Sequence, residues 1–120
     1  MKVINIKKVP RQKLGKPLFT GMVTRQSPVR DDEGSDLSID YVHFPLGIRN
    51  EFHKHANDQV LIVTEGKGIV ETKDKKVAVK EGDVIWAPAG EVHRHGAVPG
   101  HKFTHISVTR SKTKLTLIEK

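Results

Sequence analysis

The fold is decided by residues 47–66, which read GIRNEFHKHANDQVLIVTEG, and by residues 82–97, which read GDVIWAPAGEVHRHGA. Each stretch combines glycine turn signals with apolar β-branched runs and with histidines. In an extended strand, side chains two residues apart face the same side, so His53 and His55 point together. The two stretches therefore predict β-strands that carry a group of imidazoles on one face.

The rest of the sequence repeats this pattern of short apolar runs separated by turn residues. Strand candidates occur at residues 18–25, 37–44, 51–55, 59–64, 69–72, 77–79, 84–86, 92–95 and 102–109. No segment shows a sustained apolar period of 3.6 residues, so long helices are not expected. Many short strands with regular turn signals predict an all-β fold, with residues 1–120 forming one closed antiparallel barrel or jelly roll.

The two ends of the chain and the single tryptophan carry weaker signals. Residues 3–9 alternate apolar side chains before Pro10 and predict a short edge strand. Residues 115–118 predict either a terminal strand or a docking tail. Trp86 and Phe52 are expected to line the core or a pocket.

Composition excludes several classes of protein. The chain has no cysteine, so disulfides and thiolate ligands are excluded, and any metal must bind nitrogen and oxygen donors. No run of 18 apolar residues exists, and the first residues lack the apolar core of a secretory signal, so we expect a cytoplasmic protein without a membrane span. The net charge of +7 is spread toward both ends, and aromatic residues are scarce, so we expect a solvated basic surface and no nucleic-acid partner.

The spacing of polar side chains in the two stretches predicts a metal site. His53 and His55 share a strand face, Gln59 opens the next strand after a short reversal, and His93 follows a Pro-x-Gly turn. Three neutral imidazoles and one amide oxygen suit a divalent ion such as Mn, Fe, Co, Ni, Cu or Zn. The alternative is that histidines in exposed loops arose by chance, in a chain that has 7 of them.

Both stretches resemble the two signature motifs of the cupins, which fold as a double-stranded β-helix, the jelly-roll cupin barrel. The first motif spaces a glycine, two histidines, a glutamate and a glycine, and residues 47–66 match it with Gln59 in place of glutamate. The second motif spaces a glycine, a proline, a glycine, a histidine and an asparagine, and residues 82–97 match it with Ala97 in place of asparagine. The resemblance implies the barrel and the metal site, but it does not specify a reaction, because this fold hosts many chemistries.

A narrower resemblance follows from QVLIVTEGKG, VIWAPAGEVHRHGA and FTHISV together with Gln59. These look like the small single-domain cupins that include manganese-dependent hydroxynitrile lyases and relatives associated with carboxymuconolactone decarboxylases. The resemblance implies that His53, His55, Gln59 and His93 hold the metal, with manganese as the first expectation. It also implies a pocket base at His105, a pocket residue at His95, and a homodimer, in which the N-terminal strand would pair with a neighbour's sheet edge.

Three further residues are candidates for catalysis: His105, His95 and Asp40. His95 shares strand parity with His93, and His105 shares a face with Phe103, so both imidazoles are expected to face inward as proton carriers or as packed, hydrogen-bonded rings. Asp40 falls on the face of Phe44, where it would hydrogen-bond a pocket histidine, transfer a proton, or lie exposed at the strand end.

The neutral donor set leaves the charge of a divalent ion uncompensated, which favours anions or developing oxyanions at its open positions. The leading hypothesis is therefore a metal-dependent enzyme for a small oxygenated or anionic substrate, such as a hydroxynitrile lyase-like C–C bond lyase. A metal-dependent dioxygenase and a non-catalytic cupin that binds a small ligand are the alternatives, and a structural barrel with a vestigial metal site is a third.

Overall fold

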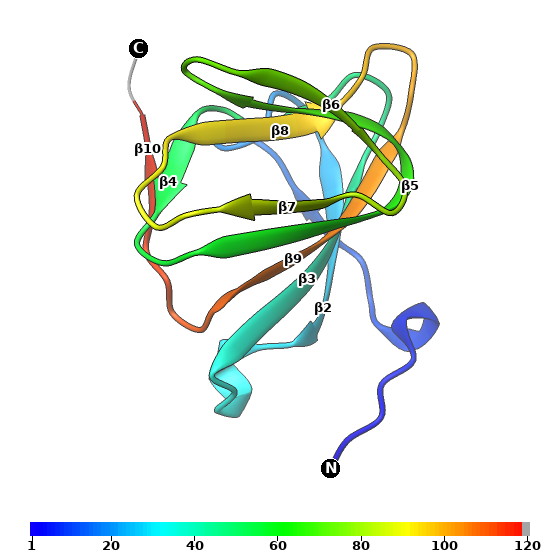
Figure 1. Ribbon diagram of the computed structural model, residues 1–120. Helices are drawn as coiled ribbons and strands as arrows, with labels where there is room; N and C mark the ends of the chain where they lie inside the picture. The colour runs from blue at the N-terminus through cyan, green and yellow to red at the C-terminus, as the bar shows by residue number, and fades with distance from the viewer. Residues whose placement is uncertain (119–120) are drawn as a thin grey trace.

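The computed structural model describes residues 1–118 and is built almost entirely of strands (Figure 1). The elements in chain order are η1 (Ile6–Lys8), β1 (Gln12–Leu14), β2 (Val23–Val29), η2 (Asp31–Glu33), β3 (Leu37–Phe44), β4 (His53–His55), β5 (Gln59–Thr72), β6 (Lys76–Lys80), β7 (Val84–Ala87), β8 (His93–Ala97), β9 (Phe103–Arg110) and β10 (Leu115–Leu117). All strand pairs are antiparallel. The all-β cupin barrel that the sequence predicts is therefore confirmed.

Strand β5 joins the two layers of the barrel. Its first half pairs with β9 and β7, and β9 continues the layer through β3 and β2 to β1. Its second half pairs with β6 and β8, and β8 continues the other layer through β4 to β10. The sheet thus curls back on itself, and its inner face encloses the core (Figure 1).

Two glycines allow β5 to pass from one layer to the other. Gly66 has φ +81°, and a Cβ there would lie 2.0 Å from the carbonyl oxygen of Lys102. At Gly68 a Cβ would lie 2.5 Å from the ring of Phe103. The register against β9 also shifts between Val63 and Glu65. The bend therefore depends on backbone that approaches too closely for any side chain.

The core follows from the alternation of side chains along the strands. Val42 and Phe44 on β3 and Phe103 on β9 are buried on the inner face. They pack with residues of the β2 and β5 strands, among them Val23 and Val63. This apolar end of the barrel leaves the other end of the interior to polar side chains.

Three sequence expectations about individual elements are wrong or incomplete. Residues 3–9 do not form an edge strand, because Ile6–Lys8 is a short 3₁₀ helix whose preceding Asn5 caps the Lys7 amide. Trp86 does not line the core: it is 65% exposed, since Ile85 and Ala87 take the inner face of β7. The runs at 59–64 and 69–72 are parts of one strand, β5.

Other expectations about the elements hold. Residues 115–117 form a terminal strand, β10, which pairs with β4 beside the predicted ligands. Among residues 1–118, the structure contains no helix long and apolar enough to cross a membrane.

Candidate metal centre

The three histidines of the predicted site meet inside the barrel. His53 and His55 lie on β4, and His93 lies on β8 directly opposite His53 in the antiparallel pair. All three side chains are buried. One ring nitrogen from each falls within 4.8 Å of the others, which is a spacing that a single metal ion can bridge.

Gln59 adds an amide oxygen to this group. It opens β5 and is 5% exposed. Its Nε2 donates a hydrogen bond of 2.8 Å to Oγ of Ser107 on β9, so its Oε1 turns toward the histidines. That oxygen lies 3.0 Å from Nε2 of His93. The structure therefore brings together all four side chains that the sequence predicts as ligands, and their role as ligands stays a prediction.

The hydrogen bonds of the rings fit a metal ion. Nδ1 of His53 donates to the carbonyl oxygen of Glu51 at 2.7 Å, and Nδ1 of His93 donates to that of Glu91 at 2.9 Å. A carbonyl oxygen only accepts, so in the neutral rings Nδ1 carries the hydrogen and Nε2 carries a lone pair.

Two features of this arrangement are unfavourable without a cation. The lone pair of His93 Nε2 faces another acceptor, Oε1 of Gln59, at 3.0 Å. Neither ring nitrogen of buried His55 has a hydrogen-bond partner among the described residues. Acceptors that converge without a donor are costly in a buried site, whereas a shared metal ion satisfies them together. The donor set therefore fits a divalent ion.

Burial also holds the rings in the form that binds metal. Desolvation lowers the pKa of His53 from 6.5 to about 4, and repulsion by His93 and His55 adds to this shift. Desolvation, followed by repulsion from His93, lowers the pKa of His55 to about 4 as well. Both imidazoles are neutral at neutral pH, so no proton has to leave before a metal ion binds.

His95 and His105 form a second pair beside these ligands. Nε2 of His105 lies 3.2 Å from Nδ1 of His95. Both rings are fully buried, and desolvation lowers the pKa of His105 to about 3 and that of His95 well below 6.5. Both face inward, as the sequence predicts, and both are neutral at neutral pH.

Asn50 fixes the direction of the hydrogen bonds in this pair. Its Oδ1 accepts a 2.8 Å hydrogen bond from the backbone N–H of His95, so its amide NH₂ is the group that lies 3.2 Å from Nε2 of the same ring. Nε2 of His95 is therefore an acceptor, its Nδ1–H donates to Nε2 of His105, and the remaining hydrogen of His105 is on Nδ1.

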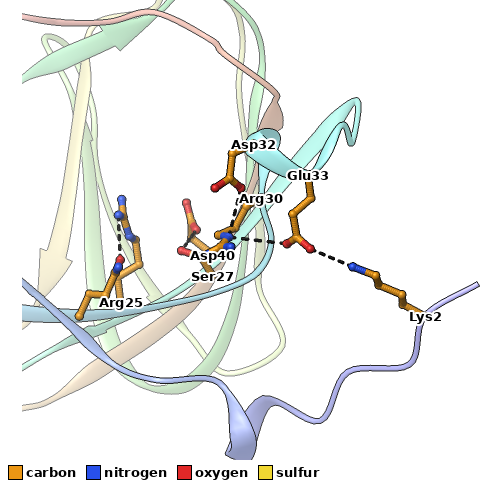
Figure 2. Close-up of polar contacts among 8 residues, drawn as sticks. Lys2, Arg25, Ser27, Arg30, Asp32, Glu33 and Asp40 are labelled. Atoms are coloured by element: carbon orange, nitrogen blue, oxygen red, sulfur yellow. Dashed lines mark hydrogen bonds and ion pairs between the residues drawn. The ribbon is translucent and has the colours of Figure 1, made fainter.

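Asp40 lies on β3 opposite Ser107, the residue that holds the Gln59 amide. It is half-buried, and its Oδ1 accepts a 2.6 Å hydrogen bond from Oγ of Ser27 (Figure 2). Of the three alternatives for Asp40, the hydrogen bond to a pocket histidine is not formed among the described residues, where its partner is Ser27. Asp40 nevertheless borders the same cavity as the histidines.

One cavity of about 300 Å³ is lined by these side chains, apart from His93 and Ser27, and also by Arg25, Val42 and Phe44. Sequence reasoning missed Arg25, Asn50 and Ser107. The alternation from buried Val23 would have placed Arg25 on the inner face, but Gly21 left the phase of that strand open. For Asn50 and Ser107 the signal is contact with a predicted site residue, which only the folded chain shows.

The sequence is similar to a known protein family and to a known enzyme. The model of the family Cupin_2, described as a cupin domain, matches residues 40–107. The chain is 34% identical over 109 residues to an (R)-mandelonitrile lyase of Granulicella tundricola, covering 88% of this chain and 83% of that protein.

Solved structures show the same fold. A cupin-like protein of Thermotoga maritima superposes with a TM-score of 0.86 at 31% identity, covering 94% of this chain and 89% of that one. The polyketide cyclase RemF of Streptomyces resistomycificus superposes with a TM-score of 0.88 at 18% identity, which shows the fold alone. Since the family model spans more than half of the sequence, and the strands and histidines lie where its motifs require, the chain belongs to the cupin family as a small Cupin_2-type protein.

Proposed function

We propose that this protein is a metal-dependent lyase that splits a small cyanohydrin into a carbonyl compound and hydrogen cyanide. The observation that carries the proposal is a group of four converging donors, three of which line a cavity together with a carboxylate and a buried imidazole pair. The similarity to a mandelonitrile lyase over most of both chains supports the same reaction class.

His53, His55, Gln59 and His93 would hold the metal ion, and we propose manganese because an amide oxygen suits a hard divalent ion beside imidazoles. When bound, such an ion supplies positive charge that acidifies a substrate hydroxyl and stabilises an anion. The four donors are uncharged, so they leave that charge available to the substrate.

The reaction needs one group that takes the hydroxyl proton and returns it to cyanide, and one hydrogen-bond donor that holds the departing anion. The substrate O–H bond breaks, its electron pair forms the carbonyl, and the C–C bond breaks with its electrons on cyanide, which then takes up a proton. Asp40 suits the first role because it is a carboxylate that borders the cavity beside Ser107.

The His95–His105 pair suits the donor role. Nε2 of His95 accepts from the Asn50 amide, and Nε2 of His105 accepts from His95. The hydrogen of the neutral His105 ring is therefore on Nδ1. A neutral imidazole with a lowered pKa is a hydrogen-bond donor and not a cation, so its N–H would orient the departing cyanide, and the proton that Asp40 takes from the hydroxyl would go to cyanide.

The test is cleavage of mandelonitrile by manganese-loaded protein, measured as the rate of benzaldehyde formation. We expect turnover that chelation and His53→Ala abolish, and that Asp40→Asn lowers about 100-fold or more without loss of metal. His101→Ala is the matched control, because His101 is an exposed histidine outside the cavity. Equal rates with loaded, chelated and His53→Ala protein would contradict the lyase proposal.

A further inference from the structure

We propose that Arg25 forms an anion-binding end of the cavity and that the substrate taken by this protein carries a carboxylate. This inference deepens the proposed function, because it assigns a substrate class to the same cavity. It rests on a buried guanidinium nitrogen, on its place in the sheet and on the charges around it.

Arg25 points into the barrel. It follows buried Val23 by two residues on β2, and it pairs with Val42 on β3. Val42 in turn pairs with His105 on β9. Directly paired residues share a face of the sheet, so Arg25, Val42 and His105 form one inward row, with Arg25 about 10 Å from His105 between Cα atoms, or two strand spacings.

One buried nitrogen of the Arg25 guanidinium is left without a partner. Nε of Arg25 is buried and has no hydrogen-bond acceptor among residues 1–118. Nη2 donates to Oε1 of Gln12 at 3.2 Å, and this acceptor is neutral (Figure 2). Buried donors on a charged group are normally satisfied, so the unpaired Nε of a side chain that lines the cavity indicates that an acceptor is missing here.

Neither carboxylate of the cavity forms an ion pair with Arg25. Asp40 accepts from Ser27, and Asp31 accepts from the backbone N–H of Lys112 at 3.3 Å. No ion pair in the described part of the chain includes Arg25. The guanidinium is therefore charged, partly buried and free of a protein counter-ion.

The charges along the cavity also favour an anion. Three cationic side chains line it, Arg25, Arg110 and Lys112, against the two carboxylates of Asp31 and Asp40. A metal ion on four neutral donors would add further positive charge. The planar guanidinium of Arg25 matches the two coplanar oxygens of a carboxylate, and a cavity of about 300 Å³ limits the ligand to a small molecule.

The experiment compares benzoate with benzamide, its neutral counterpart, by calorimetric titration of manganese-loaded protein. We expect benzoate to bind about tenfold tighter or more, and this preference to fall below about threefold in Arg25→Gln. Arg30→Gln is the matched control, because that arginine is 53% exposed and lies outside the cavity lining, so it should keep the full preference.

Two outcomes overturn the proposal. One is equal affinity for benzoate and benzamide in the wild type. The other is a benzoate preference that survives Arg25→Gln, which would place the carboxylate at the metal or elsewhere. Two further variants guard against misfolding. Arg25→Lys keeps the charge and loses the planar edge, so we expect it to retain a reduced preference for benzoate. Arg25→Met should lose the preference while its circular dichroism spectrum stays that of the wild type.

This test does not depend on turnover. Benzoate binding is read directly, so a failure to cleave mandelonitrile would sink the lyase proposal and leave the Arg25 site standing. Conversely, mandelonitrile cleavage without any preference for benzoate would keep the lyase and remove the carboxylate site.

Discussion

Ser107 decides where the Gln59 amide points, because its hydroxyl accepts from Nε2 and so leaves Oε1 toward His93. We predict that Ser107→Ala lowers the affinity for manganese about tenfold, since the amide loses its orienting partner. Ser38→Ala is the control, because that hydroxyl borders the same cavity and makes no hydrogen bond to Gln59. Metal titration of the chelator-treated protein measures both, and equal affinities in the two variants would contradict the assigned role of Ser107.

The buried histidines make the metal-free protein sensitive to acid. His53 has a pKa of about 4 in the folded chain against 6.5 in an exposed reference, so between these values the unfolded chain binds more protons. Stability therefore falls as the pH drops from 6.5 toward 4. Denaturant unfolding of metal-free protein at pH 7 and pH 5 should show a loss to which His53 alone contributes roughly 2 kcal/mol.

His55, and the fully buried His95 and His105, shift in the same direction and add to this loss. His53→Gln should flatten the pH profile, whereas His101→Gln, at an exposed position, should leave it unchanged. A stability that stays constant from pH 7 to pH 5 would show that these rings are not held neutral in the folded protein.

Among the individual residues, the sequence predicts those that carry a spacing pattern. His53, His55, Gln59 and His93 are fixed relative to one another by strand parity and turns, and the structure brings them together. Arg25 and Asn50 belong to no such pattern. Their positions depend on how β2 and the loop before β4 pack over the cavity. That packing is set by contacts between residues far apart in the sequence, which local spacing does not show.

Strand β5 carries a testable consequence at the scale of elements. We predict that Gly66→Ala costs more than about 3 kcal/mol of unfolding free energy, because the backbone has positive φ and the new Cβ meets the Lys102 carbonyl. Gly82→Ala is the matched control: φ is +92°, nothing lies within 4 Å, and we expect a cost of about 1 kcal/mol. Chemical denaturation measures the pair, and equal costs would mean that β5 crosses between layers without this close approach.

The elements themselves were predictable where side chains alternate against the core. Residues 37–44 and 102–109 were predicted as strands, and β3 and β9 form there. Two failures have physical causes. The apolar residues of 3–9 find no core to bury them, with Val3 92% exposed, so capping by Asn5 prevails over strand propensity. The size of Trp86 predicts a core position. The alternation of side chains along β7 instead places the smaller Ala87 on the inner face and Trp86 on the outer face.

The outer face of the β3–β9–β5–β7 layer is apolar over two adjacent rows. Register pairs align Trp86, Val60, Val108 and Ile39 in one row, and Val84, Ile62, Ile106 and Tyr41 in the next. Trp86 and Val84 are 65% and 64% exposed. We propose that a second copy of the chain covers this face, because a two-fold pairing buries the same apolar rows on both subunits.

Light scattering after size-exclusion chromatography tests this proposal for the whole molecule. We predict a dimer for the wild type and a monomer for Trp86→Asp, with Val77→Asp as the control, since Val77 is also exposed but lies on β6 in the other layer. A monomeric wild type, or a Trp86→Asp protein that stays dimeric, would contradict a dimer through this face.

The measurement that tests the account most directly is manganese binding by chelator-treated protein, measured by equilibrium dialysis and elemental analysis. We predict about one ion per chain for the wild type and for His101→Ala, and loss of the ion in His53→Ala and His93→Ala. This result would establish that the converging nitrogen and oxygen atoms inside the barrel bind a metal ion. No uptake of manganese or of any other divalent ion by the wild type, or equal uptake by the His53→Ala and His93→Ala variants, would contradict it.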